Sequence, residues 1–262
     1  MKKLLGFTLA EVLVTLGIIG VVAALTVPML GTNAKRQGMA TTLRSTVTDL
    51  ETAFGNAIAD QQAENIFGTD MWNNITSANP LKANSSKAAK KAFVNNLNRY
   101  LRINGADYDL NGSTYYTSKN INVHRISTTG KTGAVKEMSS DTIPIYLKNG
   151  AVMFIRAFGE EPNVRPGENG ENVSDGGFSN AADVYIDVNG ATAPNTIGRD
   201  IFTFYLTGNG ELLPAGGRVI VELGEWSKPW QNNCIQGSFG DSDWGGWSCT
   251  GRLVENGYVF DY

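Results

Sequence analysis

One long apolar segment near the N-terminus constrains this 262-residue chain more than any other feature. From Phe7 to Leu30 the residues are almost all apolar. As a helix this segment would extend about 36 Å, at about 1.5 Å per residue. The hydrocarbon core of a bilayer is about 30 Å thick. The sequence therefore predicts a membrane-spanning helix over residues 7–30.

Lys2 and Lys3 precede the apolar segment and are the only basic residues among the first 30. The positive-inside rule then places the N-terminus in the cytoplasm and the rest of the chain outside it. A secretory signal peptide is the alternative, with a shorter apolar stretch and a small-residue cleavage site. Ala23 and Ala24 lie inside the run and are followed by Leu25, so this alternative fits poorly.

Glu11 is the one charged residue inside the apolar segment. An ionisable group at membrane depth costs a few kcal/mol even on lenient scales, and it usually marks a functional site with a partner. Because the segment holds no other charge, the partner must come from a chain terminus or from another chain.

Residues 6–11, with the sequence GFTLAE, resemble the processing motif of type IV prepilins and type II secretion pseudopilins. The resemblance implies that a membrane peptidase removes the leader, residues 1–6, by cutting between Gly6 and Phe7. It also implies N-methylation of Phe7. Glu11 would then pair with the Phe7 amine of a neighbouring subunit, and a misplaced subunit would leave this charge unpaired in lipid.

The same resemblance implies a set of partners and a location. The partners are other pilin or pseudopilin subunits, a prepilin peptidase, an assembly ATPase with its inner-membrane platform, and membrane lipid. The subunit would sit in the inner membrane with a single span and its head outside the cytoplasm, and would then enter a periplasmic or cell-surface filament.

Pro28 and Gly31 close the apolar segment. A proline inside a helix removes a backbone hydrogen bond and bends or melts the helix. In the resembled family a proline at this place marks where the helix loosens in assembled filaments. A simple kink at the membrane exit is the alternative.

In residues 31–60 apolar residues recur at spacings of three and four, and this pattern predicts an amphipathic continuation of the helix. They form one stripe: Leu43, Val47, Leu50, Phe54 and Ile58.

A second helix is predicted over Lys87–Ile103, with basic residues on the face opposite its apolar side. This face could bind DNA phosphates, as in uptake pili. The net charge of −3 argues against nucleic acid as the main partner. A solvated face or an acidic neighbour is the alternative, and residues 160–175 are rich in acidic residues.

Four β-rich runs follow, and the first two flank an Asn-Gly pair that is a strong hairpin signal. The runs are Ile143–Leu147, Val152–Ile155, Val184–Val188 and Ile201–Leu206, with Arg218–Leu223 as a further strand. Helices followed by hairpin-linked strands predict an α+β fold. We therefore expect a head over residues 61–262 in which the long helix packs on an antiparallel sheet, and the family resemblance implies that this head is pilin-like.

The segment from Asp187 to Asp200 resembles a loop of secretion-type pseudopilin heads, some of which hold calcium. Asp187, Asn189 and Asp200 could supply oxygen ligands. The spacing is not that of an EF-hand. Turn capping by these Asp and Asn side chains is the alternative.

Cys234 and Cys249 are the only cysteines. If the head is exported, a disulfide is expected, and many type IV pilins close a loop by a disulfide at this end. Four tryptophans lie near it, either exposed for binding or filling a small core: Trp226, Trp230, Trp244 and Trp247.

No catalytic motif is apparent, since the chain has no GxSxG, HExxH, CxxC or P-loop. His124 is the only histidine and is interpreted as a surface or loop residue. The chain is therefore not expected to be an enzyme. The leading hypothesis is a structural subunit of a type IV pilus or a type II secretion filament. The alternative is a membrane-anchored ectodomain that binds calcium, carbohydrate or a protein.

Overall fold

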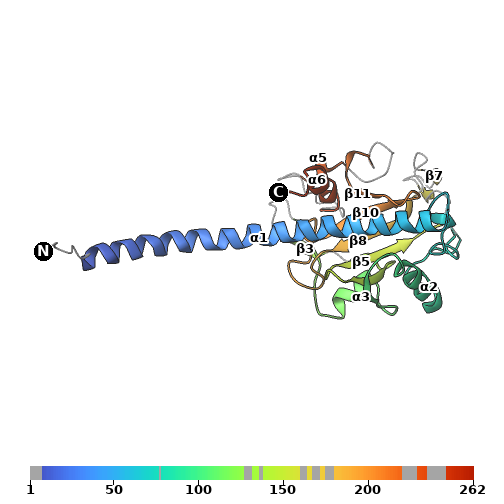
Figure 1. Cartoon of the computed structure of the whole chain (residues 1–262), viewed down its shortest axis with the longest axis horizontal. Coiled ribbons are helices and arrows are strands. Elements are labelled where there is room, and N and C mark those ends of the chain that lie inside the picture. The colour runs from blue at the N-terminus through green and yellow to red at the C-terminus, as the bar shows by residue number, and fades with distance from the viewer. Residues whose placement is uncertain are drawn as a thin grey trace. The chain divides into compact units, whose positions relative to one another are not determined.

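The computed structural model describes residues 8–76, 78–126, 132–135, 138–159, 164–166, 172–174, 180–219, 229–234 and 246–262. It divides into two units, Met1–Met39 and Ala40–Tyr262. The protein is α+β, with one long N-terminal helix and a mixed sheet (Figure 1).

Helix α1, Leu9–Asp60, has 52 residues and includes both predicted segments. In the second unit its apolar stripe is buried, with Leu43, Leu50 and Phe54 fully enclosed and Val47 nearly so. This part of the helix is bonded to the sheet at two places: Asn149 Nδ2 in the β4–β5 turn donates to Thr46 Oγ1 at 2.7 Å, and the Leu212 N–H of β11 donates to Glu51 Oε1 at 3.1 Å. The amphipathic prediction for this part of the helix is confirmed.

The main sheet has nine strands among the described residues, in the order β1-β4-β5-β8-β10-β9-β2-β3, with β11 also on β10. Their bounds are β1 Ile103–Ala106, β2 His124–Ile126, β3 Thr132–Val135, β4 Ile143–Leu147, β5 Val152–Ala157, β8 Asn180–Asp187, β9 Thr196–Ile197, β10 Ile201–Thr207 and β11 Leu212–Pro214. Strands β6, Val164–Pro166, and β7, Asn172–Ser174, form a separate pair.

The expectation of an antiparallel sheet is only partly correct. Most pairs are antiparallel, but β9 is parallel to both β10 and β2. This strand has two residues, too short to leave an alternating pattern in the sequence. The predicted hairpin is confirmed: β4 and β5 pair with Tyr146 opposite Val152, and Gly150 adopts a φ of +90° in the turn.

Two predicted elements end differently. Helix α2, Lys87–Leu97, starts after the N-cap Ser86 but stops six residues before Ile103. The Asn98 side chain accepts the backbone N–H of Ile103, where β1 begins. The strand predicted over Arg218–Leu223 is wrong where it is described, because Arg218 and Val219 are helical, and residues 220–223 lie outside the described residues.

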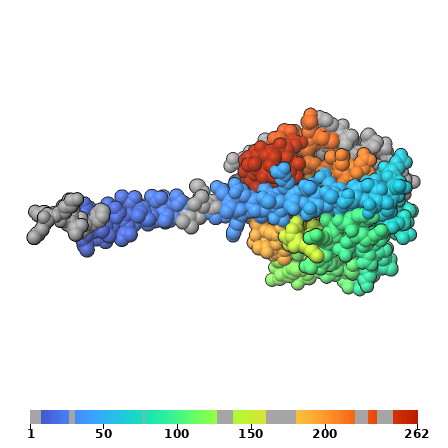
Figure 2. Space-filling view, viewed as in Figure 1, coloured from blue at the N-terminus to red at the C-terminus, as the bar shows by residue number. Residues whose placement is uncertain are grey.

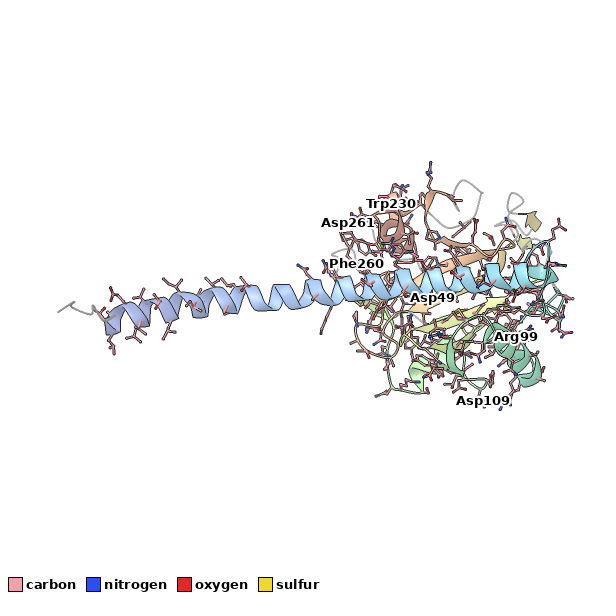
Figure 3. The ribbon with its side chains drawn as sticks, viewed as in Figure 1. Asp49, Arg99, Asp109, Trp230, Phe260 and Asp261 are labelled. Atoms are coloured by element: carbon pink, nitrogen blue, oxygen red, sulfur yellow. A yellow bond between two sulfur atoms is a disulfide. The ribbon has the colours of Figure 1, made fainter. Side chains whose placement is uncertain are left out.

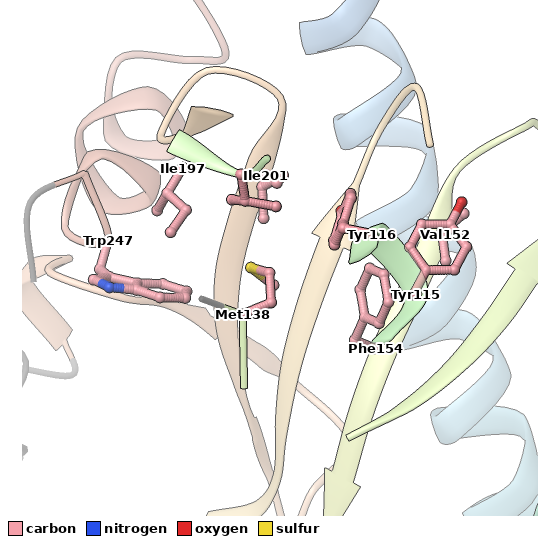
Figure 4. Close-up of a cluster of buried hydrophobic side chains, with 9 residues drawn as sticks. Tyr115, Tyr116, Met138, Val152, Phe154, Ile197, Ile201 and Trp247 are labelled. Atoms are coloured by element: carbon pink, nitrogen blue, oxygen red, sulfur yellow. The ribbon is translucent and has the colours of Figure 1, made fainter. Parts of the chain in front are cut away.

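The remaining helices are short: η1 Ile66–Gly68, α3 Gly112–Thr117, α5 Trp230–Asn233 and α6 Cys249–Glu255. Helix α3 begins with a capping box between Asn111 and Thr114. It places Tyr115 and Tyr116 into a buried cluster with Phe154 of β5 (Figure 4). On the α2 side, the Trp72 ring lies edge-on between Phe54 and Phe93, with centroid distances of 6.3 and 5.5 Å.

Candidate functional site

The first part of α1 exposes its apolar side chains on all sides. Ten large apolar residues between Leu9 and Leu25 are 43% to 80% exposed. The segment is long and apolar enough to cross a membrane, and none of it is buried (Figure 2). An apolar surface of this extent needs a lipid or protein environment. The expectation of one N-terminal span is thus supported by the length, composition and exposure of the helix.

The polar groups of this segment bond locally. Thr15 Oγ1 donates to the Val12 carbonyl at 3.0 Å, and Thr26 Oγ1 donates to the Val22 carbonyl at 2.9 Å. Such back-bonding satisfies a hydroxyl without water. Glu11 is the one ionisable side chain among residues 8–26.

Glu11 is held at the N-terminus of α1 by Thr8. The Thr8 N–H and hydroxyl both donate to Glu11 Oε2 at 2.8 Å, and the Glu11 N–H faces Thr8 Oγ1 at 3.3 Å. This is a capping box, and the Thr-x-x-Glu spacing is its sequence signature. Thr8 is a partner that the expectation of a chain terminus or another chain did not include. Within residues 8–262 as the structure describes them, Glu11 Oε1 accepts no hydrogen bond, so it retains the capacity to accept one.

The residues of the predicted cleavage, Gly6 and Phe7, lie outside the described residues. At Pro28 and Gly31 the helix continues without a break, since α1 runs from Leu9 to Asp60. Cleavage, methylation and loosening of the helix at Pro28 therefore stay predictions.

A second site lies in the head, where the loop after β8 returns to β10. It brings together two fully buried carboxylates, Asp187 and Asp200. Asp187 Oδ2 accepts the Tyr116 hydroxyl at 2.5 Å, and Asp187 Oδ1 accepts the Asn189 N–H at 3.2 Å.

Asp200 is bonded by backbone groups of the same loop. Its two oxygens accept the Asn195 and Thr196 N–H groups, at 2.7 and 2.6 Å. These bonds fix the tight path of residues 195–200, which also forms β9.

Burial disfavours the charged form of both acids. It raises the pKa of Asp187 well above its ordinary value, and the nearby charge of Asp200 raises it further. Burial likewise raises the pKa of Asp200 to about 6. The pKa of Tyr116 is also raised, first by burial and then by the Asp187 charge, so its hydroxyl stays protonated and donates.

The predicted calcium ligands Asp187, Asn189 and Asp200 are close in the structure, but their contacts suit capping better than a ready cation site. Each carboxylate oxygen already accepts a donor. No group of three or more His, Cys, Asp or Glu side chains suited to a metal occurs in the described ranges. Oδ1 of Asn189 and Oδ1 of Asn195 are buried and accept no hydrogen bond there. Calcium binding stays a prediction.

The expected disulfide between Cys234 and Cys249 is present, with both residues fully buried. Trp230 packs against it, and the Arg252 guanidinium lies 5.6 Å from the Trp230 ring centroid. Trp247 is buried in the cluster of Figure 4, as a core-filling role requires. Trp226 and Trp244 lie outside the described residues.

The basic face of α2 meets acidic residues of the same chain. Lys87 pairs with Asp109 at 2.5 Å, and Arg99 pairs with Asp70 at 3.1 Å. Figure 3 shows Arg99 and Asp109 on this side of the head. These pairs lie within one chain and partly neutralise the surface considered for DNA phosphates. The acidic residues among 160–175, considered as a neighbour on another subunit, lie outside the described residues.

His124, expected to be a surface or loop residue, lies in β2 and is half-buried, so the loop alternative is wrong. The His124 backbone N–H donates to the Asn195 carbonyl at 2.8 Å, which joins β2 to the loop between β8 and β10.

Comparison with known protein families, characterised proteins and solved structures finds no match to this chain.

Proposed function

We propose that this protein is a pilin-like subunit of a membrane-assembled filament, either a type IV pilus or a type II secretion filament. The observation that carries the proposal is the exposed apolar helix with a single acid near its start. Ten large apolar side chains surround a segment whose one charge is Glu11. A simple membrane anchor needs the apolar residues, and the acid would serve it only as a helix cap, at a cost of a few kcal/mol at membrane depth.

The proposal gives Glu11 a role in register. In the membrane, the Thr8 donors partly satisfy its carboxylate. During assembly, the free amine of Phe7 from a neighbouring processed subunit would supply the opposite charge. A subunit in the wrong axial position would leave the carboxylate unpaired in an apolar bundle, and that cost selects the correct position.

The head supports the proposal through its contacts with α1. The buried stripe and the bond from Asn149 to Thr46 make the second half of α1 part of the head. The disulfide closes the C-terminal region, as suits an exported domain. In the proposed filament, the apolar helices form the inner bundle and the heads form the outer surface.

The test replaces Glu11 by Ala and measures three quantities in the native cell: membrane retention, removal of the leader and recovery of sheared filaments. We expect retention and processing to persist and filaments to be lost. Glu64→Ala is the matched control, because Glu64 is an exposed acid with no ion pair among the described residues.

The alternative function, a membrane-anchored ectodomain that binds calcium, carbohydrate or a protein, gives the opposite pattern. Such a protein would keep Met1–Gly6 and would tolerate Glu11→Ala in its location and binding. A chain that keeps its leader and shows no Glu11 dependence would replace the filament proposal by this one.

A further inference from the structure

Four Asn-x-Ser/Thr triplets, the acceptor sequence for N-linked glycans, occur in this chain. They begin at Asn74, Asn84, Asn111 and Asn172. The Cys234–Cys249 disulfide is typical of an exported domain, where such a modification takes place. Because a transferase must reach the asparagine amide, only a triplet that the fold leaves accessible can serve as the acceptor.

Two of the triplets are held in regular structure. Asn111 is the N-cap of α3, where its Oδ1 accepts the Thr114 N–H at 2.9 Å, and Gly112 is buried. Asn172 and Ser174 belong to β7 and are paired with β6. Neither triplet can enter an active site unless α3 or the β6–β7 pair is opened.

The triplet at Asn84 begins with an exposed residue but holds the start of α2. Ser85 Oγ accepts the Lys82 N–H at 2.9 Å, and Ser86 Oγ caps α2 by accepting the Ala89 N–H at 3.2 Å. A transferase that bound this triplet would remove the cap, and a helix loses stability without its cap.

The triplet at Asn74 lies on the loop between η1 and α2. Asn74 and Thr76 are exposed, and within the described residues the Asn74 side chain forms no hydrogen bond. The backbone contacts of this triplet are those of turns. The Ile75 N–H donates to the Trp72 carbonyl at 2.8 Å, and Thr76 forms an isolated bridge with Asn79. The triplet can therefore be bound without opening a helix or a strand of the main sheet.

Asn74 also lines a groove of about 450 Å³ beside α2. Sites that hold small molecules usually have volumes of about 300–1,000 Å³. The floor of the groove is apolar and buried, and it consists of Met71, Leu81 and Phe93. Small residues of α2 form one wall: Ala88, Ala89 and Ala92.

The polar groups of the groove are mostly carboxamides. Besides Asn74, they belong to Asn73, Asn79 and Asn96. The one ionisable residue of the lining, Asp70, is paired with Arg99 at 3.1 Å, and Figure 3 labels Arg99 on this side of the head. The groove thus offers an apolar floor and neutral hydrogen-bonding groups, which suits an uncharged ligand.

We propose that Asn74 is an N-glycosylation site and that the first sugars of its glycan lie in this groove. A sugar ring has apolar C–H faces and carries hydroxyl groups at its edge. It therefore matches a floor of apolar side chains beside carboxamides, each of which both donates and accepts. The attachment atom, Asn74 Nδ2, belongs to the lining itself, so the attached glycan starts at the groove that it covers.

The transfer requires an oligosaccharide carried on a lipid diphosphate and a membrane transferase. Asn74 Nδ2 attacks the anomeric carbon of the sugar, and a C–N bond forms as the bond from that carbon to the phosphate oxygen breaks. The lipid diphosphate leaves with the electron pair, and Nδ2 loses one proton. The step therefore needs no oxidant or reductant. The Thr76 hydroxyl completes the triplet that the transferase recognises.

The inference goes beyond the proposed function and requires only that the head is exported. A membrane-anchored ectodomain would carry the same glycan. In the proposed filament, a bulky and solubilising glycan at Asn74 keeps the groove beside α2 on the outer surface, away from neighbouring heads.

The test is the mass of one tryptic peptide of the full chain, purified from its native cell. Cleavage after Arg44 and after Lys82 gives the peptide of residues 45–82, in which Asn74 begins the one acceptor triplet. We expect this peptide to carry the added mass of an oligosaccharide and to lose sugar units on fragmentation.

Variants assign the site. Asn74→Gln and Thr76→Ala should each abolish the added mass, whereas Thr76→Ser should keep it. Asn73→Gln is the matched control, because Asn73 is an exposed asparagine next to the triplet and does not begin one. Thermal unfolding verifies that each variant is folded. An unmodified peptide from the unaltered exported chain, or an added mass that persists in Asn74→Gln, would overturn the inference.

Hydroxyl-radical labelling tests the position of the glycan. Ile75 is a half-buried residue of the lining, and its labelling should rise severalfold in Asn74→Gln and stay unchanged in Asn73→Gln. Equal labelling of Ile75 in the unaltered chain and in Asn74→Gln would overturn the placement of the sugars in the groove.

The outcome is separable from that of the filament proposal. A chain with methylated Phe7 and unmodified Asn74 would overturn this inference alone. A chain that keeps residues 1–6 and carries the glycan at Asn74 would support this inference and contradict the filament proposal.

Discussion

The Tyr116 hydroxyl, on α3, donates a 2.5 Å hydrogen bond to the Asp187 carboxylate at the end of β8. Both side chains are buried, and the bond joins a short helix to the centre of the sheet. Asp187 in turn accepts the Asn189 N–H, so the same carboxylate fixes the start of the loop that leads to β10. We therefore expect the stability of the folded head to depend on the hydrogen bonds that Asp187 accepts.

Tyr116→Phe tests that dependence. The substitution keeps the ring but removes the donor, and an unsatisfied buried group costs about 1–3 kcal/mol. We expect the free energy of unfolding to fall by that amount in urea titrations of the detergent-solubilised chain. Tyr108→Phe is the control, because no hydrogen bond of its hydroxyl is seen in the described chain. Equal effects of the two variants would contradict the role given to Tyr116.

The raised pKa values of Asp187 and Asp200 predict a pH dependence of stability. A raised pKa in the folded chain means that the folded state binds more protons than the unfolded one above the ordinary value of 3.8. The stabilisation of the folded state by the two protonated acids is therefore complete below pH 3.8. It is lost as the pH rises through the pKa that each acid has in the folded chain, about 6 for Asp200. The melting temperature should fall between about pH 4 and pH 7.

Asp200→Asn isolates this contribution, because the amide has no charge to lose or gain. The variant should show a flatter dependence of melting temperature on pH than the unaltered chain. Identical slopes over the same range would contradict the assignment of the pH dependence to this buried pair.

Calcium binding by the loop can be tested by the same melting measurement. Because the Asp187 and Asp200 oxygens already accept donors, we expect millimolar calcium and chelator to give the same melting temperature. A rise with calcium that is lost in Asp200→Asn would instead assign the loop as a cation site.

The Cys234–Cys249 bridge should contribute measurably to stability. It closes a short loop, and loop-entropy estimates give such a bridge about 3 kcal/mol. Cys234→Ala with Cys249→Ala should lower the free energy of unfolding by about 2–4 kcal/mol. An unchanged value would mean that the C-terminal region is held by its other contacts, such as the ion pair between Arg252 and Asp261.

Features with a strong local signal could be predicted from the sequence. The stripe from Leu43 to Phe54 follows helical periodicity and is buried, and the Asn-Gly pair at Asn149 marks the β4–β5 turn. The two cysteines pair as expected for an exported head.

Features set by tertiary contacts could not be predicted. The apolar face of α2 continues in the sequence to Tyr100 and Leu101, yet the helix ends at Leu97 because Asn98 bonds to the start of β1. Strand β9 exists because Asp200 fixes the loop around it, which no two-residue pattern reveals. The contact between Thr8 and Glu11 had a recognisable signal, the Thr-x-x-Glu spacing. It was not expected because a charged partner was sought for Glu11, and the segment holds no second charge.

The central claim is tested most directly by the mass of the N-terminal peptide of the protein purified from its native cell. The filament proposal predicts a chain that begins at Phe7 with a methylated amine and has lost Lys2 and Lys3. A chain that still begins at Met1, or that is cut beyond Leu30, would contradict it.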